Sequence, residues 1–369
     1  MPNSPAEDPR SASSGSPFIG RLFLASLSLY GNLPYRRLCV DFGAQGTISE
    51  MIRADQLVKG GRRDLPLLRH HPAETFFGAQ LLGRDAQLLA DAAAFAETQG
   101  VNFIDLNMAC PIRVVVNRGA GAALLQRPNR IREIVQAVVS AVRIPITVKL
   151  RAGWSEDRPN LPETCAAAID GGAAALFIHP RSRLQHYRRP ANWELVREAV
   201  ARSSVPVIGN GDIYHPEEAA AALARSGCAA LAIGRGALHK PWLFQEIREN
   251  RDLDPSADER LELLRRYVRY AAEHFGDDAL GKRRTRWFLR QHMNFLCRYM
   301  PLGAVPYRQY LQTRPPGLET PRSPLEAMMA RRDLAAFEEL CDLAGLVGVS
   351  DNKPMAAALE DYSSADDDE

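Results

Sequence analysis

Short apolar runs alternate with longer amphipathic stretches between residues 20 and 245. Eight of the short runs have the length and the content of branched and aromatic residues that are typical of strands. These runs are residues 21–26, 46–50, 76–82, 102–107, 145–150, 175–180, 205–210 and 230–235. A stretch with helical periodicity follows each run, which implies parallel strands joined by right-handed helical crossovers. Eight such units predict an α/β fold of the (β/α)8 TIM-barrel type.

The pattern changes after residue 250, where a short polar segment reads as a linker. From residue 258 to residue 347 the periodicity is helical throughout, which predicts a small all-helical C-terminal domain after a barrel of residues 18–250. Residues 1–17 contain no apolar core and read as a disordered leader. Residues 348–369 read as an acidic, solvating tail.

Polar residues stand at nearly every predicted strand end. In a barrel of this type the active site lies at the carboxyl ends of the strands. The residues found there are Glu50, Gln80, Asn107, Cys110, Lys149, Arg151, His179, Arg181, Asn210, Asp212 and Arg235. Each of them alone has a structural explanation, such as a helix cap or a satisfied core group. Together, around one mouth, they favour a functional site.

Two glycine-rich loops follow the last two predicted strands, as VIGNGDI and AIGRGAL. Loops at this place in a barrel often hold a phosphate, because glycine lets the backbone approach closely and its N–H groups can bind oxygens. Arg235 adds a cation that can bind a phosphate through two hydrogen bonds. A flavin would also give roles to Lys149, as a cation beside the reduced ring, and to Gln80 at its polar edge. The residues themselves indicate a phosphorylated ligand more than they identify a flavin.

Cys110 follows a buried strand and precedes a proline, and it has three interpretations. It is a structural core cysteine, a nucleophile or a proton donor. A nucleophile needs a lowered pKa and a partner base, and the neighbouring sequence offers no dedicated base. An ordinary thiol with a pKa of about 8.5 is almost wholly protonated at neutral pH, which favours the proton donor.

The net charge is only +2, but one segment is strongly basic. Between residues 279 and 314 there are no acidic residues, and aromatic side chains are interleaved with the basic ones. The basic residues are Lys282, Arg283, Arg284, Arg286, Arg290, Arg298, Arg308 and Arg314. One interpretation is a solvated helix face over an aromatic core. The other is a binding surface for a polyanion, where neutralised phosphates supply the affinity.

Cysteine spacing and hydropathy exclude several classes of protein. The six cysteines are far apart and form no CxxC pair, which argues against a zinc site and against a disulfide framework. No window approaches the roughly 18 apolar residues that a membrane helix needs. We therefore expect a cytoplasmic protein without a metal centre or a membrane partner.

Five motifs occur in an order that resembles one known family. They are LNMACPIRVVVNRGAGAALL, ITVKLRAGW, FIHPRSRLQHYRRPANW, VIGNGDI and AIGRGALHKPWLF. Together they closely resemble the tRNA-dihydrouridine synthase family, and its bacterial branch in particular. The resemblance implies a flavin-containing barrel followed by a helical domain. It also implies that the protein uses NADPH to reduce the C5–C6 double bond of particular uridines in tRNA.

The resemblance assigns roles to individual residues of this chain. Cys110 is similar to the family's general acid, which protonates C5 of the uracil while reduced flavin delivers hydride to C6. The expected ligands of flavin mononucleotide (FMN) are Ser26, Leu27, Gln80, Lys149, His179, Asn210, Gly211, Asp212, Gly234 and Arg235. The residues expected to bind the substrate are Asn107, Arg151, Arg181, Arg290 and His292. Ser26 and Leu27 stand where the family usually has a Pro-Met pair behind the flavin.

Two other functions remain open from the sequence. One is a related flavin barrel that reduces a free pyrimidine, although a small substrate needs no basic helical domain. The other is an RNA-binding homologue whose flavin site has degraded, which the change at Ser26 suggests. The sequence does not reveal which uridine of tRNA is the target. A monomer is expected.

Overall fold

The computed structural model describes residues 15–61, 63–187, 189–302 and 320–347. Eight parallel strands form a closed barrel, because β2 pairs with both β1 and β4. These strands are β1 (Leu22–Leu24), β2 (Gly46–Ile48), β4 (Phe77–Leu82), β5 (Phe103–Asn107), β6 (Ile146–Arg151), β9 (Ala175–His179), β10 (Val207–Asn210) and β11 (Ala230–Ile233). Each lies within one of the predicted runs, apart from the last residue of β6, so the (β/α)8 barrel is confirmed.

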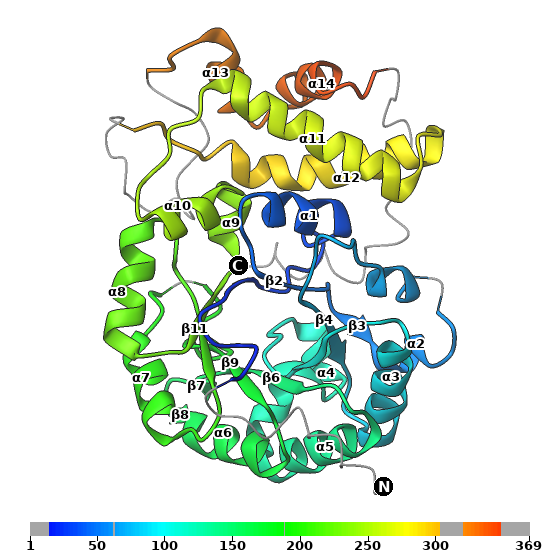
Figure 1. Cartoon of the computed structure of the whole chain (residues 1–369), viewed down its shortest axis with the longest axis vertical. Helices are drawn as coiled ribbons and strands as arrows, with labels where there is room; N and C mark the ends of the chain where they lie inside the picture. The colour runs from blue at the N-terminus through cyan, green and yellow to red at the C-terminus, as the bar shows by residue number, and fades with distance from the viewer. Residues whose placement is uncertain (1–14, 62, 188, 303–319, 348–369) are drawn as a thin grey trace, which may run out of the picture.

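Helices surround the strands, as the ring of ribbons in Figure 1 shows. The longer ones are α1 (Leu33–Asp41), α3 (Ala86–Thr98), α5 (Pro128–Ala141), α6 (Leu161–Asp170), α7 (Trp193–Arg202), α8 (Pro216–Ser226) and α10 (Leu243–Glu249). Shorter elements lie in the loops between them: β3 (Ile52–Arg53), α2 (Ala54–Leu57), η1 (Leu65–Leu68), α4 (Arg113–Asn117), η2 (Gly121–Gln126), β7 (Gly153–Ser155), β8 (Arg158–Pro159) and α9 (Arg235–His239). Proline in the first turn of α5, α6 and α8 favours helix initiation there.

The barrel interior is divided into an apolar end and a polar end. Alternate residues of a strand point to the same side. Phe23, Phe103 and Phe177 therefore point into the barrel near the amino ends of their strands, where their rings pack edge to face. Farther along β5 and β9 the same inward face carries Asp105 and His179. The phenylalanine cluster therefore fills only one end of the barrel interior, and polar groups line the carboxyl end.

Four further helices pack together beside the barrel: α11 (Ala257–Phe275), α12 (Ala279–Leu296), α13 (Pro324–Met329) and α14 (Leu334–Leu343). Asn32 Nδ2 donates to Tyr267 Oη at 3.0 Å, and the ring of Tyr35 stacks on His292 with centroids 4.1 Å apart. These contacts fix α11 and α12 against α1. The predicted C-terminal helices are therefore present, whereas residues 1–14 and the acidic tail at 348–369 lie outside the described residues.

None of the helices in the described ranges is long and apolar enough to cross a membrane.

Candidate active site at the barrel mouth

The pairing of the strands brings the predicted polar residues together at one end of the barrel. The register pairs Gln80 with Asp105, Asn107 with Lys149, and Arg151 with His179 on neighbouring strands. All six side chains are on the inward face of their strands; Asp105 is at the middle of β5, and the other five belong to the carboxyl halves of their strands. The shared mouth that the strand ends predicted is therefore formed.

The turn that carries Cys110 is held by hydrogen bonds on both sides. Asn107 Oδ1 accepts from the amides of Ala109 and Cys110, at 3.0 and 2.9 Å. Arg151 Nε donates to the carbonyl oxygen of Ala109 at 2.8 Å. A Cβ at Gly121, where φ is +57°, would lie only 2.8 Å from the Cys110 carbonyl oxygen, so a glycine is needed behind the turn.

The Cys110 thiol is in a protonated state at neutral pH. The side chain is almost fully buried against Leu82 and Val115. Burial raises the pKa of the Cys110 thiol above its usual value, because a thiolate loses its hydration, and the Ile112 amide and the Arg151 cation offset part of this rise. A protonated thiol at the mouth suits a proton donor and does not suit a nucleophile.

Lys149 and Asn210 face each other across the barrel. Lys149 Nζ donates to Asn210 Oδ1 at 3.3 Å, and Asn210 Nδ2 donates to the Ala232 carbonyl oxygen at 2.6 Å. Burial and the neighbouring Arg151 cation together lower the pKa of Lys149 to about 8, while Asp105 and Cys110 oppose the shift. Lys149 is therefore mainly charged at neutral pH, in a site shielded from solvent where its field is less screened.

His179 is in contact with Arg181 and lies near a second arginine, Arg235. Arg181 Nη1 donates to His179 Nε2 at 3.1 Å, and Arg181 Nη2 forms an ion pair with Asp212 at 2.5 Å. Arg235 also reaches Asp212, at 3.3 Å, and lies beneath the ring of Tyr187. Burial, with the nearby cations, holds the pKa of His179 well below its usual value, so the imidazole is neutral.

Arg151 and Arg181 have structural contacts that the sequence did not predict. Both guanidinium groups are almost fully buried, and Arg151 also donates to the carbonyl oxygen of Ser182. Arg181 Nε donates to the Arg189 carbonyl oxygen at 2.5 Å. These contacts position the loops around Cys110 and His179. Direct contact of either arginine with substrate stays a prediction.

The residues around the first strand fit a flavin. Ser26 Oγ is buried and has no hydrogen-bond partner within the described residues, so it is available to a bound group. Gly234 borders open space, since a Cβ built there would meet only Asn210 Nδ2 and Leu27 Cδ2, each at 3.8 Å. Lys149 supplies a cation on the same side of the barrel. A planar group with polar edges and a developing negative charge matches this set of neighbours.

The glycines of the last two loops have different functions. A Cβ at Gly209 would lie 2.4 Å from the ring of Trp193, and one at Gly236 would lie 2.0 Å from the Ile213 carbonyl oxygen. These two glycines therefore permit close packing behind the loops. At Gly211, where φ is +144°, a Cβ would lie 2.9 Å from Ala191 Cβ, so this glycine also serves the turn itself. Gly234 remains the glycine whose open side can approach a ligand.

The basic segment divides into buried and exposed arginines on α12. Arg283, Arg284 and Arg290 are exposed, whereas Arg286 is buried and forms an ion pair with Glu338 of α14. His292 is also buried, against Tyr35, so it does not reach the surface, and its predicted contact with tRNA stays a prediction. Arg308 and Arg314 lie outside the described residues.

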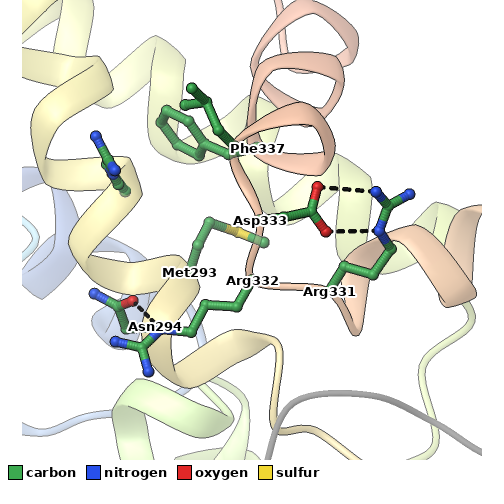
Figure 2. A pocket seen from close by; sticks show the side chains of 8 residues that line it. Met293, Asn294, Arg331, Arg332, Asp333 and Phe337 are labelled. Carbon is green, nitrogen blue, oxygen red and sulfur yellow. Dashed lines mark hydrogen bonds and ion pairs between the residues drawn. The ribbon is translucent and has the colours of Figure 1, made fainter.

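A cavity of about 270 Å³ opens between α12 and the turn that joins α13 to α14. Figure 2 shows Arg332 joined to Asn294, and Arg331 joined to Asp333 by two bonds. Arg290 lines the same cavity. The cavity is therefore an extension of the exposed basic surface of α12 and is separate from the barrel mouth.

Three residues at the mouth were missed or not chosen from the sequence. Asp105 is fully buried and binds Gln80, and the signal for it was an acidic residue inside an apolar strand. Glu50 was noted at a strand end without a role, and its Oε2 accepts from the amide of Leu29 at 2.7 Å. Tyr187 covers Arg235, and nothing in its local sequence marks it.

Comparison with known proteins adds independent findings. A family model described as dihydrouridine synthase matches residues 24–313. A tRNA-dihydrouridine(47) synthase-like protein of Mus musculus, whose name also carries NAD(P)(+), is 40% identical over 328 residues, covering 88% of this chain and 51% of the relative. A tRNA-dihydrouridine(47) synthase of Cryptococcus neoformans is 40% identical over 84% of this chain and 45% of the relative. The chain thus spans about half the length of the curated relatives it matches, and a specifically bacterial relationship stays a prediction.

Two solved structures share the fold. A complex of 2-naphthoyl-CoA reductase with 2-naphthoyl-CoA has a TM-score of 0.51 at 14% identity, covering 63% of this chain and 50% of that chain. Histamine dehydrogenase from Rhizobium sp. 4-9 has a TM-score of 0.51 at 15% identity, covering 68% of this chain and 49% of that chain. At these identities the likeness shows the fold alone.

Proposed function

Because the chain belongs to the dihydrouridine synthase family, we propose that it reduces a uridine of tRNA to 5,6-dihydrouridine, with FMN as cofactor and NADPH as reductant. The observation that carries the proposal is the buried Cys110 thiol on a turn held by Asn107 and Arg151, at the mouth of a barrel that fits a flavin. Lys149, His179 and Ser26 are the residues best placed to hold the FMN.

Cys110 is the general acid of the proposed reaction. Reduced FMN, when bound, supplies a hydride to C6 of the uracil. The Cys110 thiol gives its proton to C5, so the C5–C6 double bond becomes a single bond and Cys110 is left as a thiolate. The cations of Lys149 and Arg151 stabilise that thiolate until it is reprotonated from solvent. Asn107 keeps the turn in place during the transfer.

The tRNA is held mainly by the C-terminal helices. Arg283, Arg284 and Arg290 of α12 give an exposed cationic surface without acidic neighbours in the helix, and the arginines of the cavity in Figure 2 extend it. Contacts to phosphates there offset the cost of flipping the target base into the barrel. We propose residues 258–347 as this tRNA-binding domain, working in a cytoplasmic monomer.

The target we propose is uridine 47, since the relatives from Mus musculus and Cryptococcus neoformans are named tRNA-dihydrouridine(47) synthases. The catalytic mouth alone does not choose the position, because it contacts one base. The choice depends on how the helical domain orients the tRNA.

The test combines a spectrum with a tRNA assay. The purified full chain is expected to show a flavin absorption band that bleaches with NADPH. It is then expected to add two hydrogens to uridine 47 of unmodified tRNA, measured by mass spectrometry of ribonuclease fragments. A flavin that bleaches without any reaction on tRNA, but with reduction of free uracil, would favour the free-pyrimidine reductase. Tight tRNA binding by a protein that takes up no flavin would favour the RNA-binding homologue.

Replacement of Cys110 tests the role of the acid. Cys110→Ala is expected to keep the flavin band and tRNA affinity but to lower the rate of dihydrouridine formation by about 10²- to 10⁴-fold. Cys165→Ala in α6 is the matched control, since Cys165 is equally buried and lies away from the mouth. Near-normal activity of the Cys110 variant would remove this residue from the mechanism.

A further inference from the structure

A buried carboxylate lies directly below the catalytic turn. Asp105 is on the inward face of β5 and has no exposed surface. Its two oxygens accept from Gln80 Nε2 at 2.6 Å and from Thr147 Oγ1 at 2.7 Å. Burial raises the pKa of Asp105, while these two hydrogen bonds and the Lys149 cation lower it. Burying a carboxylate is costly, so its presence at this point needs a reason.

A chain of directed hydrogen bonds leads from Asp105 to Cys110. Gln80 gives its Nε2 hydrogen to Asp105, and its Oε1 accepts from Asn107 Nδ2 at 2.7 Å. Asn107 Oδ1 then accepts from the amides of Ala109 and Cys110. We call these four bonded groups, from Asp105 through Gln80 and Asn107 to the amides of the Cys110 turn, the amide relay.

The direction of the amide relay is fixed at both ends, because the amides of Ala109 and Cys110 can only donate and Asp105 accepts through both of its oxygens. Both oxygens of Asp105 act as acceptors, so the carboxyl group selects the NH2 group of Gln80. The Gln80 oxygen is then the end that meets Asn107, and it selects the NH2 group of that residue. This leaves the Asn107 oxygen as the end that faces the Cys110 turn. If Asn107 were reversed, its NH2 group would face the two donating amides of the turn. If Gln80 were reversed, its NH2 group would face that of Asn107 and its oxygen would face Asp105.

We propose that Asp105 is a positioning residue that acts through the amide relay to hold Cys110 in place. The inference rests on the proposed role of Cys110 as the proton donor, and it adds the residue that fixes where the thiol lies. A general acid must be placed within hydrogen-bond reach of the atom it protonates, and a displacement of about 1 Å costs on the order of 10²-fold in rate.

Asp105→Leu tests the proposal on the full-length protein. Leucine has the same branched shape as aspartate but no acceptor, so the Gln80 amide loses the group that orients it. The rate of alkylation by iodoacetamide is measured at each cysteine by peptide mass spectrometry. We expect a rise of about tenfold at Cys110, as for the loss of one hydrogen bond, with no change at the buried Cys39 and Cys165. Turnover is expected to fall by about 10- to 100-fold, with KM for tRNA unchanged.

Asp105→Asn is the conservative control. Its Oδ1 can still accept from Gln80 while its Nδ2 donates to Thr147 Oγ1, whose hydroxyl then donates to the Ile104 carbonyl oxygen 3.4 Å away. The relay keeps its direction, so alkylation of Cys110 and turnover are expected to stay within about threefold of the unmodified protein. Asp105→Val, which suits a strand and is smaller, serves if the leucine variant does not fold.

Two results would overturn the proposal. Alkylation that rises equally at all six cysteines would mean that Asp105 only stabilises the barrel. Alkylation and turnover that do not change in the leucine or valine variant would mean that the Cys110 turn keeps its conformation without Asp105. The alkylation assay needs neither tRNA nor NADPH, so it separates a failure of this proposal from a failure of the proposed function.

Discussion

The barrel mouth and α12 use the same kinds of charged residue in opposite ways. At the mouth, Arg151 and Arg181 are buried, and their donors are bound to carbonyl oxygens and to Asp212. On α12, Arg283 and Arg284 are exposed to solvent. A buried arginine whose hydrogen bonds are satisfied fixes the positions of the loops it contacts, whereas an exposed arginine attracts anions through its long-range electrostatic field. Under the proposed function, the mouth positions one base and the helix attracts the rest of the tRNA.

Arg286 shows that this division does not follow the sequence. It lies two residues after Arg284 in the same basic run, but it is buried under Phe337 and paired with Glu338. It therefore resembles the arginines of the mouth more than its own neighbours. The number of basic residues in α12 overstates the surface that a polyanion could meet.

Replacement of Arg283 and Arg284 by glutamate should have the largest effect on tRNA binding among the substitutions that test this comparison. We expect tRNA affinity to fall by about 10- to 100-fold and the slope of its logarithm against salt concentration to become shallower by about one to two. Arg143→Glu with Arg202→Glu is the matched control, because both residues are exposed just before strands β6 and β10, at the other end of the barrel. Equal effects of the two pairs would show that only net charge matters.

Replacement of Arg286 should affect stability before it affects binding. Arg286→Leu leaves Glu338 without its partner, and we expect a loss of about 2 to 3 kcal/mol in the free energy of unfolding, below the usual cost for a buried pair because Glu338 is half exposed. The salt slope of tRNA binding should be unchanged. Urea unfolding of Arg286→Leu beside Arg284→Leu separates the two kinds of arginine, and a similar midpoint for both variants would contradict the division.

The pH dependence of stability tests the mouth alone, with a smaller effect. Burial raises the pKa of Glu50 from 4.5 to about 7, while the Leu29 amide and Arg36 oppose the shift. The folded protein therefore holds this proton more tightly than the unfolded chain does. The stability that the protonated Glu50 contributes is complete below about pH 4.5 and is lost as pH rises towards 7.

Glu50→Gln should remove that slope, which is on the order of 2 kcal/mol between pH 5 and pH 8. Melting temperatures across this range are the measurement, with Glu163→Gln on the exposed side of α6 as the control. An unchanged slope in the Glu50 variant would mean that this carboxyl is ionised at neutral pH like an ordinary one.

Much of the site could be predicted because strand ends are visible in the sequence. A short apolar run gives the strand, and the polar residue at its carboxyl end gives the rim of the barrel, as for Asn107 and Lys149. Asp105 was missed because it lies inside a run, where an acidic residue is read as an interruption. Its partner Gln80 is 25 residues away, and only the pairing of β4 with β5 brings the two together.

The sequence by itself determined the eight strands, the helices after them and the identity of the thiol and the lysine at the mouth. These depend on local periodicity and on the rule that parallel strands end at one face. Only the tertiary structure decided which arginines are buried, which amides are oriented and how Cys110 is held. Those properties depend on strand register and on contacts between residues far apart in the chain, which no local pattern encodes.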